Sequence, residues 1–295
     1  MTGFDTTAKS AETAKGAAAR PEPGIMPGRE RRAARTAAAP AVRGRRPLGL
    51  WRLEVLRVTR TRRWLLLLLA FPLLGILGPI VVRHLHRILD VLGADGGALP
   101  ETVEAQDAMI AYTGVGGQIG LLVALGVMAA ALALDHRPGL AAFYRTRTCR
   151  PRDLVIPRWT VCAAAVCLAN LLATGIVWAE IRWLFGPVPA DRMIYGMLFE
   201  TVYLLMALSL VAGAAAFLRR PVALFGAALI AMVLSPLPRL WKPLRAWEPS
   251  ELGGAGIQLL GESTPGDFVR PAIVALLLTA VMLSLAVWRI GRREM

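Results

Sequence analysis

Six stretches of mostly apolar residues constrain this chain more than any other feature of its sequence. A helix needs about 20 apolar residues to cross the hydrocarbon core of a bilayer, and each stretch approaches that length. Only 18% of the residues are charged and the mean hydropathy is +0.53, which is unlike an average soluble domain. We therefore expect an all-α membrane protein with six transmembrane helices, at about 64–82, 114–134, 159–179, 193–218, 221–237 and 271–288.

Two different segments precede the first expected span. Residues 1–47 are rich in Ala, Gly, Pro, Thr and charge, so we predict a disordered basic cytoplasmic tail. Residues 48–63 combine arginines with Trp51 and several leucines, which is typical of an interfacial helix that lies on the membrane. The alternative is a snorkelling extension of the first span. On the preferred interpretation, residues 48–295 form one six-helix transmembrane domain.

Local patterns within the spans predict how the helices pack. Pro72 and Pro79 in the first span should interrupt its backbone hydrogen bonds. In the second span, Gly116, Gly120 and Ala124 recur every four residues, which predicts a face for close contact with another helix.

The distribution of basic residues predicts the orientation of the chain. Of its 34 Lys and Arg residues, 26 fall on one side of the expected topology and 8 on the other. Because basic residues are retained on the cytoplasmic side, both termini should be cytoplasmic. The net charge of +14 is then explained by topology in a plasma (cytoplasmic) membrane, and it requires no nucleic-acid partner.

The sequence offers little catalytic chemistry. It has no phosphate-binding P-loop, no Gly-x-Ser-x-Gly and no His-Glu-x-x-His, so we expect no catalytic, cofactor or metal site. Glu200 is the ionisable residue most nearly inside a span, and such carboxylates are often functional. Its alternative is contact with water near the outer end of the helix. An intramembrane enzyme would instead depend on Glu200, Asp135 or His136.

The only sizeable cytoplasmic loop between spans is 135–158, which carries six arginines. That charge would serve either to retain the loop inside the cell or to dock a cytoplasmic protein, and charge alone does not separate the two.

Three features resemble the membrane permeases of ABC-2-type transporters, across about residues 48–295. A basic segment ending in Arg-Thr-Arg-Arg at 60–63 precedes a Leu-rich span with Gly-Pro at 78–79. The sequence Asp-His-Arg-Pro-Gly-Leu at 135–140 is similar to the family's acidic, basic and Gly-Thr pattern, and 147–159 resembles the segment that follows it. The order of the six spans, with a longer outer loop at 238–270, is also similar. Asp135 and Leu140 depart from the family's Glu and Thr.

The resemblance implies an exporter permease that is energised by a separate ABC ATPase and is paired with a second permease copy or paralogue. The loop would couple to the ATPase through Asp135, Arg137, Gly139, Arg145, Arg147, Arg152, Asp153 and Arg158. The alternative is a non-transporting multi-pass membrane protein with an immunity, scaffold or regulatory role.

Overall fold

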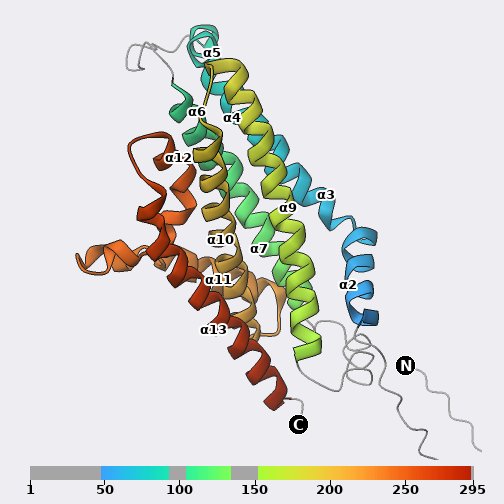
Figure 1. The fold of residues 1–295 in the computed structure, drawn as a ribbon. Coiled ribbons are helices and arrows are strands. Elements are labelled where there is room, and N and C mark those ends of the chain that lie inside the picture. The colour runs from blue at the N-terminus through green and yellow to red at the C-terminus, as the bar shows by residue number, and fades with distance from the viewer. Residues whose placement is uncertain (1–47, 93–103, 134–151, 294–295) are drawn as a thin grey trace, which may run out of the picture. The chain divides into compact units, whose positions relative to one another are not determined.

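The computed structural model describes residues 48–92, 104–133 and 152–293. Within these ranges the chain is helical and contains no strand. Six helical segments are long and apolar enough to cross a membrane, which confirms the six predicted spans (Figure 1). These segments are Arg63–Arg83, Ala105–Leu132, Arg152–Phe185, Ala190–Ala215, Pro221–Leu240 and Pro265–Arg292. The predicted tail at 1–47 lies outside the described residues.

The first two spans are assembled from shorter helical pieces. After helix α2 (Leu48–Arg60), the first span comprises α3 (Arg63–Leu68), the π-helical turn η1 (Leu69–Leu73) and α4 (Leu74–Arg83). Pro72 lies inside η1, which fits the expected interruption, whereas Pro79 remains within α4. Helix α5 (Leu85–Leu92) follows. The second span comprises α6 (Ala105–Ala111), the π-helical turn η2 (Tyr112–Gly117) and α7 (Gln118–Leu132).

The predicted close-packing face of the second span is confirmed, and its partner is the first span. A Cβ added at Gly120 would lie 2.6 Å from the Phe71 ring, and one at Gly116 would lie 3.2 Å from the backbone nitrogen of Gly75. A Cβ at Gly78 would in turn approach the backbone nitrogen of Tyr112 to 2.9 Å. Small residues therefore bring the two backbones into contact beside both π turns.

The third span begins earlier than predicted. Helix α9 (Arg152–Phe185) has 34 residues, so it is about 50 Å long and exceeds the hydrocarbon thickness. The hydropathy of the sequence identified only the apolar stretch that begins at residue 159, but the charged first turns of α9 are helical as well. Asp153 lies in the first turn, where a negative charge interacts favourably with the helix dipole. Arg158 consequently belongs to the helix and not to the preceding loop.

The remaining spans differ in how deeply they are packed. Half of the most apolar window is buried in the spans at Ala105–Leu132 and Ala190–Ala215, against 17% in Pro221–Leu240. The helices of these later spans are α10 (Ala190–Ala215), α11 (Pro221–Leu234) and α13 (Val269–Arg293). The core therefore lies among α7, α9 and α10, and the apolar side chains on α11 and α13 are largely left for lipid.

The predicted outer loop contains short helices, and three of them pack on α10. The helices are η4 (Leu237–Leu240), η5 (Arg245–Trp247), η6 (Pro249–Gly254), α12 (Ala255–Leu260) and η7 (Pro265–Phe268). Those that pack on α10 are η6, α12 and η7, while η5 packs on α13. A Cβ at Gly196 would lie 2.8 Å from the Gly256 Cα, so α10 and α12 meet backbone to backbone. Arg192 donates hydrogen bonds to the carbonyls of Leu259 and Gly261, at 3.2 and 3.0 Å.

Candidate functional site

The described part of the predicted coupling loop is its carboxyl end. Asp135, Arg137, Gly139, Arg145 and Arg147 lie outside the described residues, so their roles stay predictions. Arg152 and Asp153 form the first turn of α9, with 3.9 Å between Arg152 Nε and Asp153 Oδ1. The Arg152 side chain is exposed and that of Asp153 is partly exposed, so both can meet a partner.

Arg158 has a different environment from the rest of the predicted set. Its Nε atom lies 2.9 Å from Oε1 of Glu54 on α2, and the two side chains are only 3% and 6% exposed. The second Glu54 oxygen lies 3.6 Å from Arg57 Nη1, one turn further along α2. Arg158 is therefore held inside the protein by α2 and is not presented at the surface. We call this contact the α2–α9 ion pair.

The α2–α9 ion pair also reaches the end of the second span. Arg158 Nη1 donates to the carbonyl of Ala131 on α7, at 3.5 Å. Since α7 enters the predicted loop and α9 leaves it, one guanidinium contacts the helices on both sides of that loop as well as α2. Figure 1 shows α2 beside the lower half of α9. Arg158 is thus placed to hold the end of α7 and the start of α9 against the middle of α2.

Sequence reasoning missed Glu54, although a signal was present. Glu54 is the single acidic residue in the basic segment 48–63. A lone carboxylate among many arginines on a helix predicts an ion pair. In the structure Glu54 is buried while its neighbours Leu53 and Val55 are exposed, so Glu54 lies on the face of α2 that meets α9.

Glu200 lies at the centre of a second polar cluster, inside the bundle. Its side chain is buried among the helices, at 8% exposed. The Glu200 carboxylate interacts with Asn170 of α9. It also lies beside η2, because a Cβ added at Gly117 would be 3.9 Å from Glu200 Oε1. Tyr203, on the next turn of α10, lies within electrostatic range of the same carboxyl.

Asn170 and Tyr112 complete this cluster from the neighbouring spans. Asn170 is fully buried, yet neither its amide nitrogen nor its oxygen makes a hydrogen bond of normal geometry. The Tyr112 hydroxyl lies 3.4 Å from Oγ1 of Thr174, one turn from Asn170 on α9. A buried amide without full hydrogen bonding is unusual, and π-helical turns such as η2 often occur at functional positions.

The α2–α9 ion pair and the Glu200 cluster can hold helices together or bind polar partners. Within 48–92, 104–133 and 152–293, no group of three or more His, Cys, Asp or Glu side chains could hold a metal ion. The α2–α9 ion pair links helix ends, and the Glu200 cluster joins α9, α10 and η2 through polar contacts inside the bundle.

No protein-family model, curated protein or solved structure matches the chain. What the fold defines is a multi-pass α-helical membrane protein. The resemblance to ABC-2-type permeases stays a prediction.

Proposed function

We propose that this chain is the membrane-spanning permease subunit of an ABC-2-type transporter, acting as an exporter in the plasma membrane. A separate cytoplasmic ABC ATPase would dock on the 135–158 loop, and a second permease copy or paralogue would complete the transport pathway. The proposal rests on the sequence resemblance together with one structural observation, the α2–α9 ion pair.

The α2–α9 ion pair supports the proposal because it connects the parts that a coupling loop must move. A movement of the loop driven by the ATPase would reach α7 and α9 directly, because these two helices flank the loop. Arg158 contacts both helices and also Glu54, so α2 would move with them. The role of Arg158 in this proposal is therefore to anchor the coupling region, and not to contact the ATPase.

The docking surface then consists of the remaining polar residues of the loop. Arg152 and Asp153 are accessible at the start of α9. Asp135, Arg137, Gly139, Arg145 and Arg147 stay candidates by resemblance. The absence of a P-loop from the sequence agrees with an energy source on another chain.

The Glu200 cluster suits a protein whose spans change their relative positions. It joins three different spans through contacts that are incompletely satisfied, so alternative partners are available when α9 and α10 shift. Buried polar groups of this kind commonly mark pathways or moving interfaces inside membranes.

Co-purification with the ATPase tests the proposal. The full chain would be expressed with the ABC ATPase encoded beside its gene, and ATPase retention and ATP hydrolysis would be measured. We expect R147E/R152E to weaken ATPase binding at least about tenfold, because like charges at an interface cost several kcal/mol. The matched control R87E/R182E reverses two arginines on the opposite predicted side and should bind normally.

Two results would count against the permease assignment. One is failure of the wild-type chain to retain any ATPase while it is correctly inserted. The other is equal ATPase binding by R147E/R152E, R87E/R182E and the wild type, which would leave a non-transporting membrane protein as the better description.

A further inference from the structure

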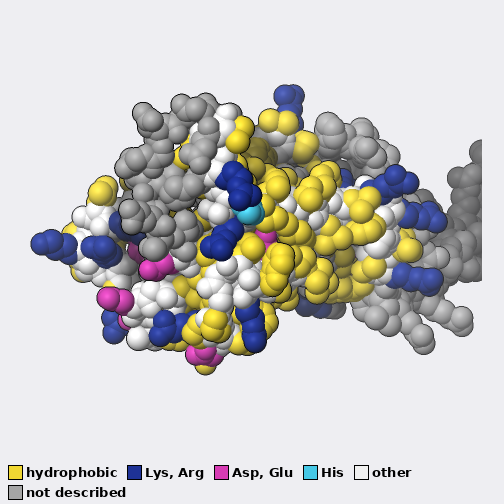
Figure 2. Space-filling view, turned by 90° about the horizontal axis from the view of Figure 1, so that it is seen from above, with side chains coloured by type: hydrophobic (Ala, Val, Ile, Leu, Met, Phe, Trp, Pro, Cys, Tyr) yellow, Lys and Arg dark blue, Asp and Glu magenta, His cyan; other side chains and the backbone are white. Residues whose placement is uncertain are grey.

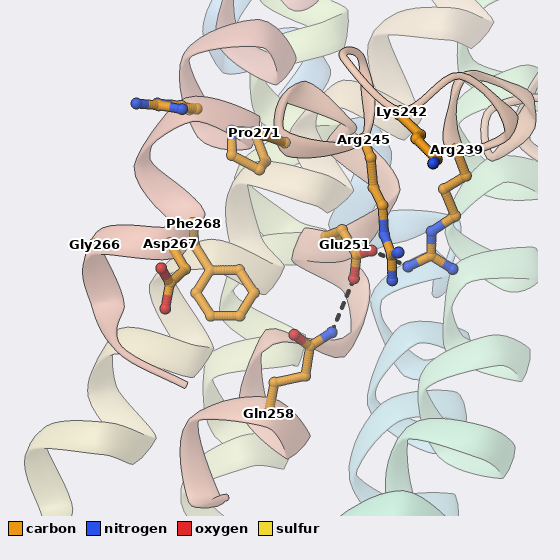
Figure 3. Close-up of a pocket in the computed structure, with 11 residues that line it drawn as sticks. Arg239, Lys242, Arg245, Glu251, Gln258, Gly266, Asp267, Phe268 and Pro271 are labelled. Carbon is orange, nitrogen blue, oxygen red and sulfur yellow. Dashed lines mark hydrogen bonds and ion pairs between the residues drawn. The ribbon is translucent and has the colours of Figure 1, made fainter. Parts of the chain in front are cut away.

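A basic pocket opens among the short helices between the last two spans. It has a volume of about 820 Å³ and lies between the end of the span Pro221–Leu240 and the start of Pro265–Arg292. Figure 3 shows the guanidinium groups of Arg239 and Arg245 beside Glu251, with Lys242 on the same loop but farther from that carboxylate. The charged residues that line the basic pocket are Arg239, Lys242, Arg245, Arg270, Glu251 and Asp267.

The carboxylates near the pocket are already occupied. Arg239 pairs with Glu251 and also lies 2.8 Å from Oε2 of the buried Glu248. Glu251 accepts a further hydrogen bond from Gln258 at 2.9 Å. The Asp267 carboxylate accepts hydrogen bonds from the backbone nitrogen and hydroxyl of Thr264, both at 2.9 Å.

Positive charge is consequently left over in the pocket. Lys242 and Arg245 are exposed, and Arg245 lies within electrostatic range of Glu251. The Arg270 guanidinium lies over the Trp247 ring, 5.7 Å from its centroid. The pocket lining carries four cations against the carboxylates of Glu251 and Asp267, so its net charge is positive.

The apolar surroundings indicate where this charge lies relative to the membrane. Leu240 and Trp241 are 85% and 69% exposed, directly beside Lys242. Exposed Leu237, Leu244 and Trp247 continue this apolar surface along the same segment. In Figure 2, most acidic side chains in view lie toward the left, basic side chains lie toward both ends, and hydrophobic side chains cover much of the middle. Trp with Lys or Arg at the end of a span is typical of the bilayer interface.

We propose that the basic pocket binds the phosphate of an anionic phospholipid headgroup. Lys242, Arg245 and Arg270 would contact the phosphate, and the acyl chains would lie along Leu237, Leu240 and Trp241. A soluble phosphate compound would gain nothing from this apolar surface, whereas a lipid uses both parts. The inference does not depend on the permease assignment, because it uses only the geometry of the last two spans.

Lipid titration of the purified full-length protein tests this inference. Native mass spectrometry in detergent would measure binding of a phosphatidylglycerol, of the phosphatidylcholine with the same acyl chains, and of glycerol phosphate. We expect the phosphatidylglycerol to bind best. In K242Q/R245Q its affinity should fall roughly 25-fold, since each basic residue near a membrane surface contributes about a factor of five.

Two further variants separate pocket charge from general effects. The charge-preserving K242R/R245K should keep the wild-type affinity, and so should R87Q/R182Q, which removes two exposed arginines elsewhere. Equal phosphatidylglycerol affinity in K242Q/R245Q and the wild type would overturn the proposal. So would glycerol phosphate binding as tightly as the phospholipid, which would indicate a site for soluble anions, and so would equal affinity for phosphatidylcholine.

Discussion

Two arginine–carboxylate groups in this protein have the same chemistry and opposite surroundings. In the α2–α9 ion pair, Arg158 and Glu54 are both nearly inaccessible. In the second group, which we call the Arg239 cluster, Arg239 is 46% exposed while it pairs with Glu248 and Glu251. Burial removes water as an alternative partner, so the loss of either member of the first pair leaves the other charge without its closest partner. In the Arg239 cluster, Arg239 keeps access to water and to ligands, while Glu248 is buried.

This difference predicts a difference in role. A fully enclosed pair specifies where helices meet, because any rearrangement that separates the charges removes the closest partner of each where little water can replace it. A partly open cluster contributes less to stability but can border a binding site, as the Arg239 cluster borders the basic pocket. The predictions below test this distinction through stability, from the largest effect to the smallest.

The largest effect is expected when one partner of the α2–α9 ion pair is removed. In R158M, the buried Glu54 carboxylate loses its closest cation, and we expect a loss of about 3–5 kcal/mol in the free energy of unfolding. Denaturant unfolding in detergent, followed by tryptophan fluorescence, would measure it. The double variant E54M/R158M should recover most of this loss, because it removes both charges and replaces them with apolar side chains.

The control for this experiment lies on the same helix. Arg182 of α9 is exposed, so R182M should change stability by less than about 0.5 kcal/mol. If E54M/R158M is no more stable than R158M, the burial of an unpaired charge is not the cause of the loss.

A smaller effect is expected at the Arg239 cluster. In R239Q, the buried Glu248 carboxylate loses its cation, but Glu251 keeps its hydrogen bond from Gln258. We expect a loss of about 1–3 kcal/mol, below that of R158M, because Glu248 keeps its hydrogen bond from Ser250 and Glu251 keeps that from Gln258. The same unfolding measurement applies, with the charge-preserving R239K as the comparison. A loss in R239Q equal to or larger than that in R158M would contradict the distinction between the two groups.

The sequence predicted the spans better than it predicted either group. Runs of about 20 apolar residues are sufficient to locate membrane helices, because lipid imposes length and hydrophobicity on each one separately. The pairing of Glu54 with Arg158 joins residues 104 positions apart, so it depends on how helices pack. Periodicity predicts which face of α2 is apolar but does not determine which helix covers it.

The outer loop was predicted only as a connection. Residues 238–270 contain prolines and glycines, which favour turns, and their sequence shows no long apolar run from which a packing partner could be predicted. The same residues allow short helices and a close backbone contact between Gly196 and Gly256, which attaches the segment to α10. The basic pocket follows from this attachment, so sequence spacing alone could not reveal it.

The smallest effect concerns the response of the Arg239 cluster to pH. Burial alone would raise the pKa of the Glu251 carboxyl, but hydrogen bonds from Arg239 and Gln258 outweigh it and hold that pKa below its usual value. A lowered folded-state pKa stabilises the protein above the unfolded pKa, near 4.3 for glutamate, and this stabilisation is lost as pH falls through the folded-state pKa. We expect E251Q to be less stable than the wild type by about 1 kcal/mol at pH 7. The gap should narrow steadily below about pH 4.

The exposed Glu262 offers a matched control, since E262Q removes one carboxylate that has no ion pair within the described residues. A gap between E251Q and the wild type that widens toward acid pH would show that Glu251 is destabilised as a carboxylate, and the Arg239 cluster would then have to be regarded as strained and not as a stabilising border of the pocket.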